Sequence, residues 1–341
     1  MIVDRDTLAV SPCCDELLHE LAGEQVNEVE AGPLRFSNEL ALHVVEMKTN
    51  GPVPKLDGLA EAFAAGVATL SAKLAERGAM LMPTAMHPTM DPAEGKLWPH
   101  DGKPIYATYD RVFGTSGHGW VNLQSTHVNL PFRGDEEFGR LHAAIRAVLP
   151  LLPGLAASSP VVEGVLADAL DQRLRVYLGN QRRIPSIIGQ VVPEPVWTEA
   201  AYRREILAPM YRDIAPFDPH GELQDEWLNS RGAIARFDRS AIEIRLLDIQ
   251  EHPAADVAIT WLVSQLLREL CQESFVPMVE LQALATAPLA AILVQAIDEA
   301  DDAVVGHASL LRALGLPEVP IRLTELWSAV LTRAWERRTP P

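Results

Sequence analysis

The sequence predicts an α+β protein in which helices cover one face of a mainly antiparallel sheet. Three observations support this class. Strand and helix patterns mix irregularly up to about residue 250, the segment beyond Glu251 has a helical pattern almost throughout, and no repeat, low-complexity segment or linker divides the chain. We therefore expect one domain over residues 1–341, with 251–341 as its helical C-terminal portion.

Two long helices follow from apolar spacing. In residues 57–78, apolar side chains recur at helical intervals and Gly78 supplies a stop. A second helix is predicted from Gly134, with Phe138 and Ile145 on its apolar face and proline near its end. The intervening stretch, residues 82–119, is rich in Pro and Gly and predicts loops beside a surface cleft.

Residues 240–250, SAIEIRLLDIQ, predict a strand that carries charge on one face. Because strand side chains alternate, Ile242, Ile244 and Leu246 share one side. The other side then holds Glu243, Arg245 and Leu247. One interpretation is an ion pair on a solvated face, which contributes little to stability. The other is the floor of a polar site.

Two more strands carry polar residues in apolar surroundings. WVNLQSTHVNLPF places His127 with Ser125 and Asn129 on one face, and LALHVVEMKTNGP places Glu46 with Lys48. A buried carboxylate must be paired or coordinate a metal. The cluster of Glu46, Glu243 and His127 suggests a hard cation with an imidazole ligand. Alternatively, His127 is a core histidine and Glu46 pairs with Lys48 or an arginine.

Composition limits the class of partner. The net charge of −17 argues against nucleic acid and anionic membranes, because both attract Lys and Arg. Three cysteines form no ligand or disulfide pattern, the N-terminus lacks an apolar signal core, and no apolar run reaches the roughly 20 residues of a membrane span. We expect a cytoplasmic protein, and nothing in the sequence excludes an oligomer. Phosphate-loop, dinucleotide, zincin and hydrolase motifs are all absent.

Four segments resemble motifs of the glutamate–cysteine ligases and related carboxylate–amine ligases, in the same order along the chain. RGAIARFDRSAIEIRLLDIQEHP is similar to the family's C-terminal strand motif, and STHVNLPF to its strand with a metal-binding histidine. NELALHVVEMKTNGPV resembles its E-x6-E-x2-T segment, and AVLPLLPGLAASSP the stretch after the histidine strand. Together these segments span most of residues 30–260.

The resemblance implies a glutamine-synthetase-like antiparallel sheet, curved into a funnel, that binds ATP and Mg2+. It implies that Arg245 is catalytic and contacts the transferring phosphate or a substrate carboxylate, and that Arg231 and Arg236 contact anions. Glu39 lies seven residues before Glu46, which puts the two on opposite faces of a straight strand, so a bend between them is expected. The implied metal ligands are Glu39, Glu46, His127 and Glu243.

The implied activity is ATP-dependent ligation of a carboxylate, such as the γ-carboxylate of glutamate, to an amine such as cysteine through an acyl phosphate. The family opens with a strand bearing two metal-binding glutamates, which would precede Met1. We therefore expect either an upstream start or a metal site that has lost ligands, with weak activity from Met1 onward. Two alternatives are a non-catalytic relative that binds a glutamate-like ligand or a partner protein, and a zinc hydrolase that uses the His/Glu cluster.

Overall fold

The structure is a computed structural model in which residues 1–337 are described. Contacts divide the chain into two compact units, which are described separately here. Unit 1 comprises Met1–Gln124, Val161–Ala167 and Ile249–Ala258, and unit 2 comprises Ser125–Pro160, Asp168–Asp248 and Ile259–Pro341. The expectation of a single domain stays a prediction.

Unit 1 contains three small antiparallel sheets. One sheet has the order β2-β3-β4, β1 pairs with β5, and β7 pairs with β8. The strands are β1 Ile2–Asp4, β2 Glu28–Ala31, β3 Leu34–Asn38, β4 Val45–Thr49, β5 Ala79–Leu81, β7 Val161–Val162 and β8 Val165–Leu166. The helices are α1 Cys14–Ala22, α2 Leu59–Ala75, α3 Lys103–Phe113 and α4 His118–Val121, with a 3-10 turn at Pro92–Glu94.

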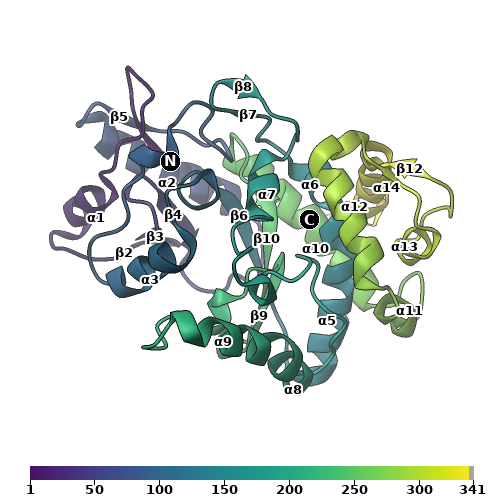
Figure 1. Ribbon diagram of the computed structural model, residues 1–341. Coiled ribbons are helices and arrows are strands. Elements are labelled where there is room, and N and C mark those ends of the chain that lie inside the picture. Colours follow the sequence, from purple (N-terminus) through teal and green to yellow (C-terminus); the bar gives the residue numbers. More distant parts are fainter. Residues whose placement is uncertain (338–341) are drawn as a thin grey trace. The chain divides into compact units, whose positions relative to one another are not determined.

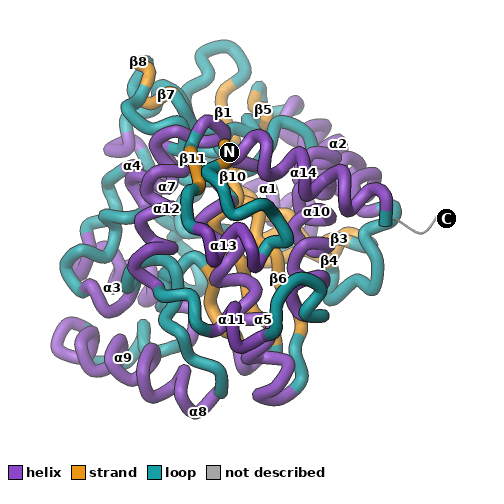
Figure 2. Tube along the Cα trace, turned by 90° about the vertical axis from the view of Figure 1, so that its right-hand side faces the viewer, coloured by secondary structure: helices purple, strands orange, loops and turns teal. Residues whose placement is uncertain are grey.

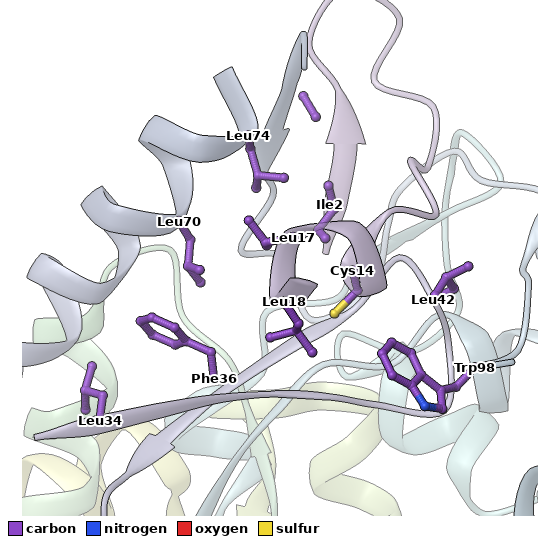
Figure 3. Packing of buried hydrophobic residues seen from close by; sticks show 11 residues of the cluster. Ile2, Cys14, Leu17, Leu18, Leu34, Phe36, Leu42, Leu70, Leu74 and Trp98 are labelled. Carbon is purple, nitrogen blue, oxygen red and sulfur yellow. The ribbon is translucent and has the colours of Figure 1, made fainter. Parts of the chain in front are cut away.

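The core of unit 1 lies between β3 and the helices α1 and α2, which both pack against this strand (Figure 1). Leu70 of α2 points toward Phe36 of β3, and Leu34 of β3 packs against α2 (Figure 3). Leu74 of α2 points toward Leu17 of α1 (Figure 3). All five side chains are at most 2% exposed. Because β3 side chains alternate, Arg35 and Ser37 lie on the opposite face. This sheet therefore has one apolar face under helices and one polar face, as the sequence predicts.

Unit 2 is built around a three-stranded antiparallel sheet with the order β6-β10-β9. Its strands are β6 Ser125–Pro131, β9 Ala233–Arg236 and β10 Ala241–Asp248, and β11 Val304–Val305 pairs with β12 Ile321–Arg322. The longer helices are α5 Gly134–Val148, α10 Pro253–Cys271, α12 Thr286–Glu299 and α14 Leu323–Glu336. The first six residues of α10 belong to unit 1.

Shorter helical segments complete unit 2. They are α6 Pro153–Ala156, α7 Gln172–Tyr177, α8 Glu199–Tyr202, the π-helix Arg203–Leu207, α9 Ala208–Ile214, α11 Met278–Gln282 and α13 Ala308–Ala313. The 3-10 turns are Leu149–Leu151, Pro185–Ile187, Ala215–Phe217, Glu226–Leu228, Phe237–Arg239 and Ala300–Asp302. In Figure 2, α11 to α14 appear as separate helices joined by loops.

Both long helices expected from apolar spacing are confirmed, as α2 and α5, and so is the α+β class. Two expectations are wrong in part. Residues 82–119 contain α3 as well as loops, because the left-handed Gly102 and Pro104 in the first turn start a helix that ends at Gly114. The part beyond Glu251 is not purely helical, because β11 and β12 pair there as a small antiparallel sheet, with α13 in the connection between them.

The predicted single sheet is also replaced by several small ones. In the central strand β10, both faces are buried, and only Arg245 is partly exposed. The expected division into an apolar face and an open polar face therefore fails for this strand. Among residues 1–337, none of the helices combines the length and apolar composition that crossing a membrane requires.

Candidate active site

The candidate residues fall into two groups by unit. Glu39 and Glu46 belong to unit 1, whereas His127, Arg231, Arg236, Glu243 and Arg245 belong to unit 2. The group in unit 2 centres on β10, which runs beside β6 (Figure 1). Glu243 pairs with Asn129 of β6 and with Ile234 of β9, so these three side chains share one face of the sheet.

A β-bulge in β10 sets the direction of Arg245. Ile244 pairs with Val128 and Leu247 pairs with Thr126, so Arg245 and Leu246 together oppose His127 alone. Because of this extra residue, Leu247 lies on the face of Ile244, and the predicted alternation, which put Leu247 with Glu243, is wrong beyond Arg245. Bulges of this kind often re-aim a side chain beside an active site.

Glu243 is an ionised carboxylate in a buried position. Its residue is 6% exposed, its Oε1 accepts a hydrogen bond of 2.6 Å from Nε of Arg245, and Nδ1 of His127 lies 3.5 Å away. Burial alone would raise its pKa. The charge of Arg245, together with the neighbouring His127 and Arg236, outweighs that effect and holds the pKa of Glu243 at about 2.

Arg245 is anchored by its backbone as well as its side chain. Its N–H donates to the carbonyl of Gly232 at 2.9 Å, and its Nη1 donates to the carbonyl of Asn229 at 3.3 Å. Its side chain is 20% exposed, so the guanidinium reaches solvent while Glu243 does not. Gly232 has no room for a side chain, because a Cβ there would lie 2.7 Å from Leu246.

Arg231 is buried, and its guanidinium donates hydrogen bonds to neighbouring residues. It is 3% exposed, and its Nε and Nη2 each donate to Glu194 at 2.6 Å. Its Nη1 donates to the carbonyl of Ser186 and to Oδ1 of Asn229. This geometry favours a structural role over the anion contact that the resemblance implies.

Arg236 is also buried and paired, but it lies closer to the site. Its guanidinium donates to both carboxylate oxygens of Asp238, at 3.1 and 3.0 Å. Although burial opposes it, this contact helps to lower the pKa of Asp238. The charge of Arg236 also acts on Glu243, so the arginine contributes to the electrostatics of the site.

His127 lies on the exposed side of β6. Its side chain is 37% exposed, and Nε2 lies 3.0 Å from Oγ of Ser125. The alternative of a core histidine is therefore wrong. Asn129, the cross-strand partner of Glu243, is also exposed. His127, Asn129, Glu243 and Arg245 thus form a polar row that combines oxygen, imidazole and guanidinium groups.

Glu46 lies on the polar face of the sheet in unit 1. Its Oε2 accepts hydrogen bonds from Oγ of Ser37 at 2.8 Å and from Nζ of Lys48 at 3.0 Å. Lys48 also pairs with Glu28 at 2.7 Å. With a side chain that is 34% exposed, Glu46 is not in the apolar surroundings that its flanking residues suggest. The alternative pairing with Lys48 is confirmed.

Glu39 follows β3 directly and is exposed. A turn between it and β4 supplies the expected bend, so the two glutamates are not on one straight strand. Glu39 and Glu46 both act electrostatically on Tyr106. Burial, reinforced by Glu39, raises the pKa of Tyr106 to about 12, so this hydroxyl stays protonated and interacts with Nδ2 of Asn38 at 3.1 Å.

Sequence reasoning missed several members of both groups. Ser37 and Glu28 complete the polar face around Glu46, but they belong to strands that the apolar pattern did not predict. Their alternation with Phe36 and Val29 was the available signal. Asp248 lies inside the motif I-E-I-R-L-L-D-I, and its partner Arg173 is distant in sequence, so only the fold could join them.

The donors of unit 2 fit a divalent cation only in part. Among the described residues, neither unit gathers three or more His, Cys, Asp or Glu side chains into a group that could hold a metal ion. Glu243 is ionised and His127 lies beside it, so two suitable donors are present in unit 2. They fit part of a coordination shell, and Mg2+ commonly completes its shell with water and substrate phosphates.

Comparisons with known proteins give the chain its relatives. The family model described as glutamate-cysteine ligase family 2 (GCS2) matches residues 4–314. An uncharacterized protein of Archaeoglobus fulgidus is 36% identical over 262 residues, which cover 77% of this chain and 70% of that protein. A protein of Rubrobacter xylanophilus named "Putative glutamate--cysteine ligase 2-3" is 32% identical over 180 residues, covering 52% of this chain and 46% of that protein.

Proposed function

Since this chain belongs to the glutamate–cysteine ligase family 2, we propose that it is an ATP-dependent ligase that joins a carboxylate to an amine. The carboxylate would be the γ-carboxylate of glutamate or a close analogue, and the amine would be cysteine or a similar compound. A glutamine-synthetase-like arrangement of the sheet belongs to the same proposal. The observation that carries it is the Glu243–Arg245 pair, a buried ionised carboxylate and a guanidinium on one strand.

The reaction has two steps. A carboxylate is a poor acyl donor, so its oxygen first attacks the γ-phosphorus of ATP, the bond to the bridging oxygen breaks, and ADP leaves. The amine nitrogen then attacks the acyl carbon of the acyl phosphate. The bond from carbon to the phosphate oxygen breaks, phosphate leaves with the electron pair, and the nitrogen releases a proton.

The two charged residues of the Glu243–Arg245 pair would have different roles in the reaction. The planar fork of Arg245 can hold two oxygens of the transferring phosphoryl group, which a lysine cannot do. Glu243 keeps Arg245 in place through the 2.6 Å hydrogen bond and, with His127, supplies donors for Mg2+. When bound, Mg2+ would neutralise the charge that develops on the phosphates. By the resemblance, Glu39 and Glu46 are further candidate ligands.

A second candidate function is a non-catalytic member that binds a glutamate-like ligand or a partner protein. The observation that favours it is that the charge of Glu46 is already neutralised by Lys48, with no metal needed. The two functions differ in ATP consumption, because a binding protein forms no ADP however tightly it holds glutamate.

The test is an assay of ADP release with ATP, Mg2+ and glutamate against a panel of amines. We expect ADP to form only when both glutamate and a suitable amine are present, and Glu243→Gln to abolish it. Binding of glutamate by calorimetry without ADP release would favour the non-catalytic alternative. Hydrolysis of an amide substrate that requires Zn2+ instead of Mg2+ and does not depend on ATP would favour a hydrolase.

A further inference from the structure

A second set of charged side chains lies at the C-terminal end of β10, and it is fully buried. Asp248, Arg173 and Asp171 are 1%, 2% and 0% exposed. All three belong to unit 2, with Arg173 in α7 and Asp171 at its N-cap. Burying three ionisable groups is costly unless they are paired, so their arrangement needs a physical reason.

Asp248 is the centre of this set. Its Oδ2 accepts hydrogen bonds from the N–H of Ser158 at 2.8 Å and from Oγ of Ser159 at 2.9 Å. Its Oδ1 accepts a hydrogen bond from Nε of Arg173. The N–H of Arg173 in turn donates to Oγ of Ser159 at 3.0 Å. The end of β10 is thus tied to the start of α7 and to the segment after α6.

Arg173 also reaches the bulge itself. Its Nη2 donates to the carbonyl oxygen of Leu246 at 2.8 Å, while its Nε holds Asp248. Leu246 is one of the two bulge residues that oppose His127, and the other is Arg245. A bulge disrupts the regular ladder and leaves a residue without its usual pairing. The guanidinium of Arg173 therefore contacts both the bulge, at Leu246, and the last residue of β10, Asp248.

The third group of the set, Asp171, differs from the other two. Burial and the neighbouring charge of Asp248 raise the pKa of Asp171 well above its ordinary value, which favours its protonated form. One of its oxygens caps α7 by accepting from the N–H of Leu174 at 2.9 Å. Arg173 and Asp248 then form a single neutral ion pair, held in a fixed geometry by the hydrogen bonds around it.

We propose that Arg173 and Asp248 are positioning residues for Arg245: by holding the carbonyl of Leu246 and the end of β10, they fix the bulge that aims the Arg245 guanidinium. Arg173 never touches substrate in this account and acts through the backbone. Its effect on turnover rests on the proposed ligase function, whereas its effect on the geometry of β10 does not.

Arg173→Lys separates positioning from stability. Lysine keeps the positive charge beside Asp248, but its single ammonium group cannot hold both Asp248 and the carbonyl of Leu246 as the fork does. Asp218→Asn is the matched control, because Asp218 is also buried in unit 2 and accepts from the N–H groups of Glu222 and Leu223, away from β10.

Two measurements are made on the full chain. Hydrogen exchange followed by mass spectrometry reports on the N–H of Arg245, which bonds to Gly232. We expect Arg173→Lys to speed exchange in residues 241–248 at least about tenfold, and Asp218→Asn to leave it unchanged. In steady-state assays, we expect Arg173→Lys to lower kcat about tenfold with KM for ATP changed less than twofold, and Asp218→Asn to change neither.

The outcomes separate the two proposals. If the wild-type chain releases no ADP with any amine, the ligase function fails, and exchange in β10 alone decides the positioning role. The positioning role is overturned if residues 241–248 exchange at the same rate in the Arg173→Lys and Asp218→Asn variants. It is also overturned if Arg173→Lys speeds that exchange but leaves kcat of an active ligase unchanged. If Arg173→Lys does not fold, Ser159→Ala takes its place, because it removes one hydrogen bond from Asp248. Ser159→Ala must then speed exchange in residues 241–248 and lower kcat more than Asp218→Asn does.

Discussion

Two strands of this protein carry the same short pattern, a glutamate followed two residues later by a base. In β4 the pair is Glu46 and Lys48, and in β10 it is Glu243 and Arg245. Both pairs form an ion contact along one strand, at 3.0 Å and 2.6 Å. The side chain of Glu46 is 34% exposed, whereas that of Glu243 is 8% exposed.

The difference lies in what surrounds each carboxylate. Glu46 lies on a partly exposed face, where it accepts a hydrogen bond from Ser37 and shares Lys48 with Glu28, so water and neighbouring groups screen its pair. Glu243 lies in the central strand of its sheet, where desolvation must be offset by several positive charges, and its pKa falls to about 2. The same pattern of a glutamate and a base therefore gives a partly exposed ion pair in one unit and a largely buried one in the other.

Among substitutions in the two pairs, we expect Glu243→Gln to have the largest effect, and this effect is on turnover. Glu243→Gln should lower ADP formation at least about 100-fold, equivalent to about 3 kcal/mol of transition-state stabilisation, because it removes a donor for Mg2+ and the acceptor that orients Arg245. Steady-state assays and circular dichroism together check this result. A correctly folded Glu243→Gln variant with full activity would remove Glu243 from the site.

Arg245 gives the next largest effect. Arg245→Lys should lower kcat at least about tenfold, or roughly 1.4 kcal/mol, because one ammonium group cannot hold two phosphate oxygens. Lys48→Arg is the matched exchange in β4, and we expect it to change kcat less than twofold. If Arg245→Lys altered only KM for the amine, the guanidinium would act at the acceptor and not at the phosphate.

Acid stability sharpens the comparison without any assay of activity. Because the pKa of Glu243 is about 2 in the folded chain and 4.5 ordinarily, the ionised group stabilises the fold above pH 4.5. This contribution, about 3 kcal/mol, is lost as the pH falls from 4.5 toward 2. Urea unfolding across this range should show a steeper loss in wild type than in Glu243→Gln.

The control for acid stability is Glu46→Gln, which should follow the wild-type curve. Its carboxylate is one-third exposed, so its loss changes the unfolding free energy by less than about 1 kcal/mol. A Glu46→Gln curve that flattens as much as that of Glu243→Gln would mean that burial does not separate the two pairs.

The smallest expected effect is that of the β4 pair on salt dependence. Lys48→Ala should lower the free energy of unfolding by roughly 0.2–1 kcal/mol in dilute buffer, and 1 M salt should remove most of that difference. Thermal unfolding at two salt concentrations measures it. A difference that persists at high salt would point to packing of the lysine stem and not to its charge.

The sequence was informative where a pattern reflects local geometry. Apolar spacing predicted α2 and α5, and alternation placed Glu46 beside Lys48 and Glu243 beside Arg245. Alternation failed at Leu247, because a bulge depends on pairing with a distant strand. The contact of Arg173 with Asp248 joins residues 75 apart in the chain, so no local pattern could predict it.

The sequence pattern also failed to predict how deeply the polar side chains of the strands are buried. Glu46 has apolar neighbours in sequence, but those neighbours point to the core while its own side chain faces water. The side chain of His127 is likewise exposed, although its neighbour Val128 is buried. Glu243 differs because β10 has a strand on each side and is buried on both faces, which only the order β6-β10-β9 reveals.

The most direct test of the central claim follows an oxygen atom. If Glu243 and Arg245 serve a ligase that forms an acyl phosphate, glutamate labelled with 18O in its γ-carboxylate must transfer one labelled oxygen to inorganic phosphate. Phosphorus NMR with ATP, Mg2+ and an accepted amine should show one 18O per phosphate released by wild type, and no phosphate from Glu243→Gln. Unlabelled phosphate would contradict the account, because water and not the carboxylate would then have attacked ATP.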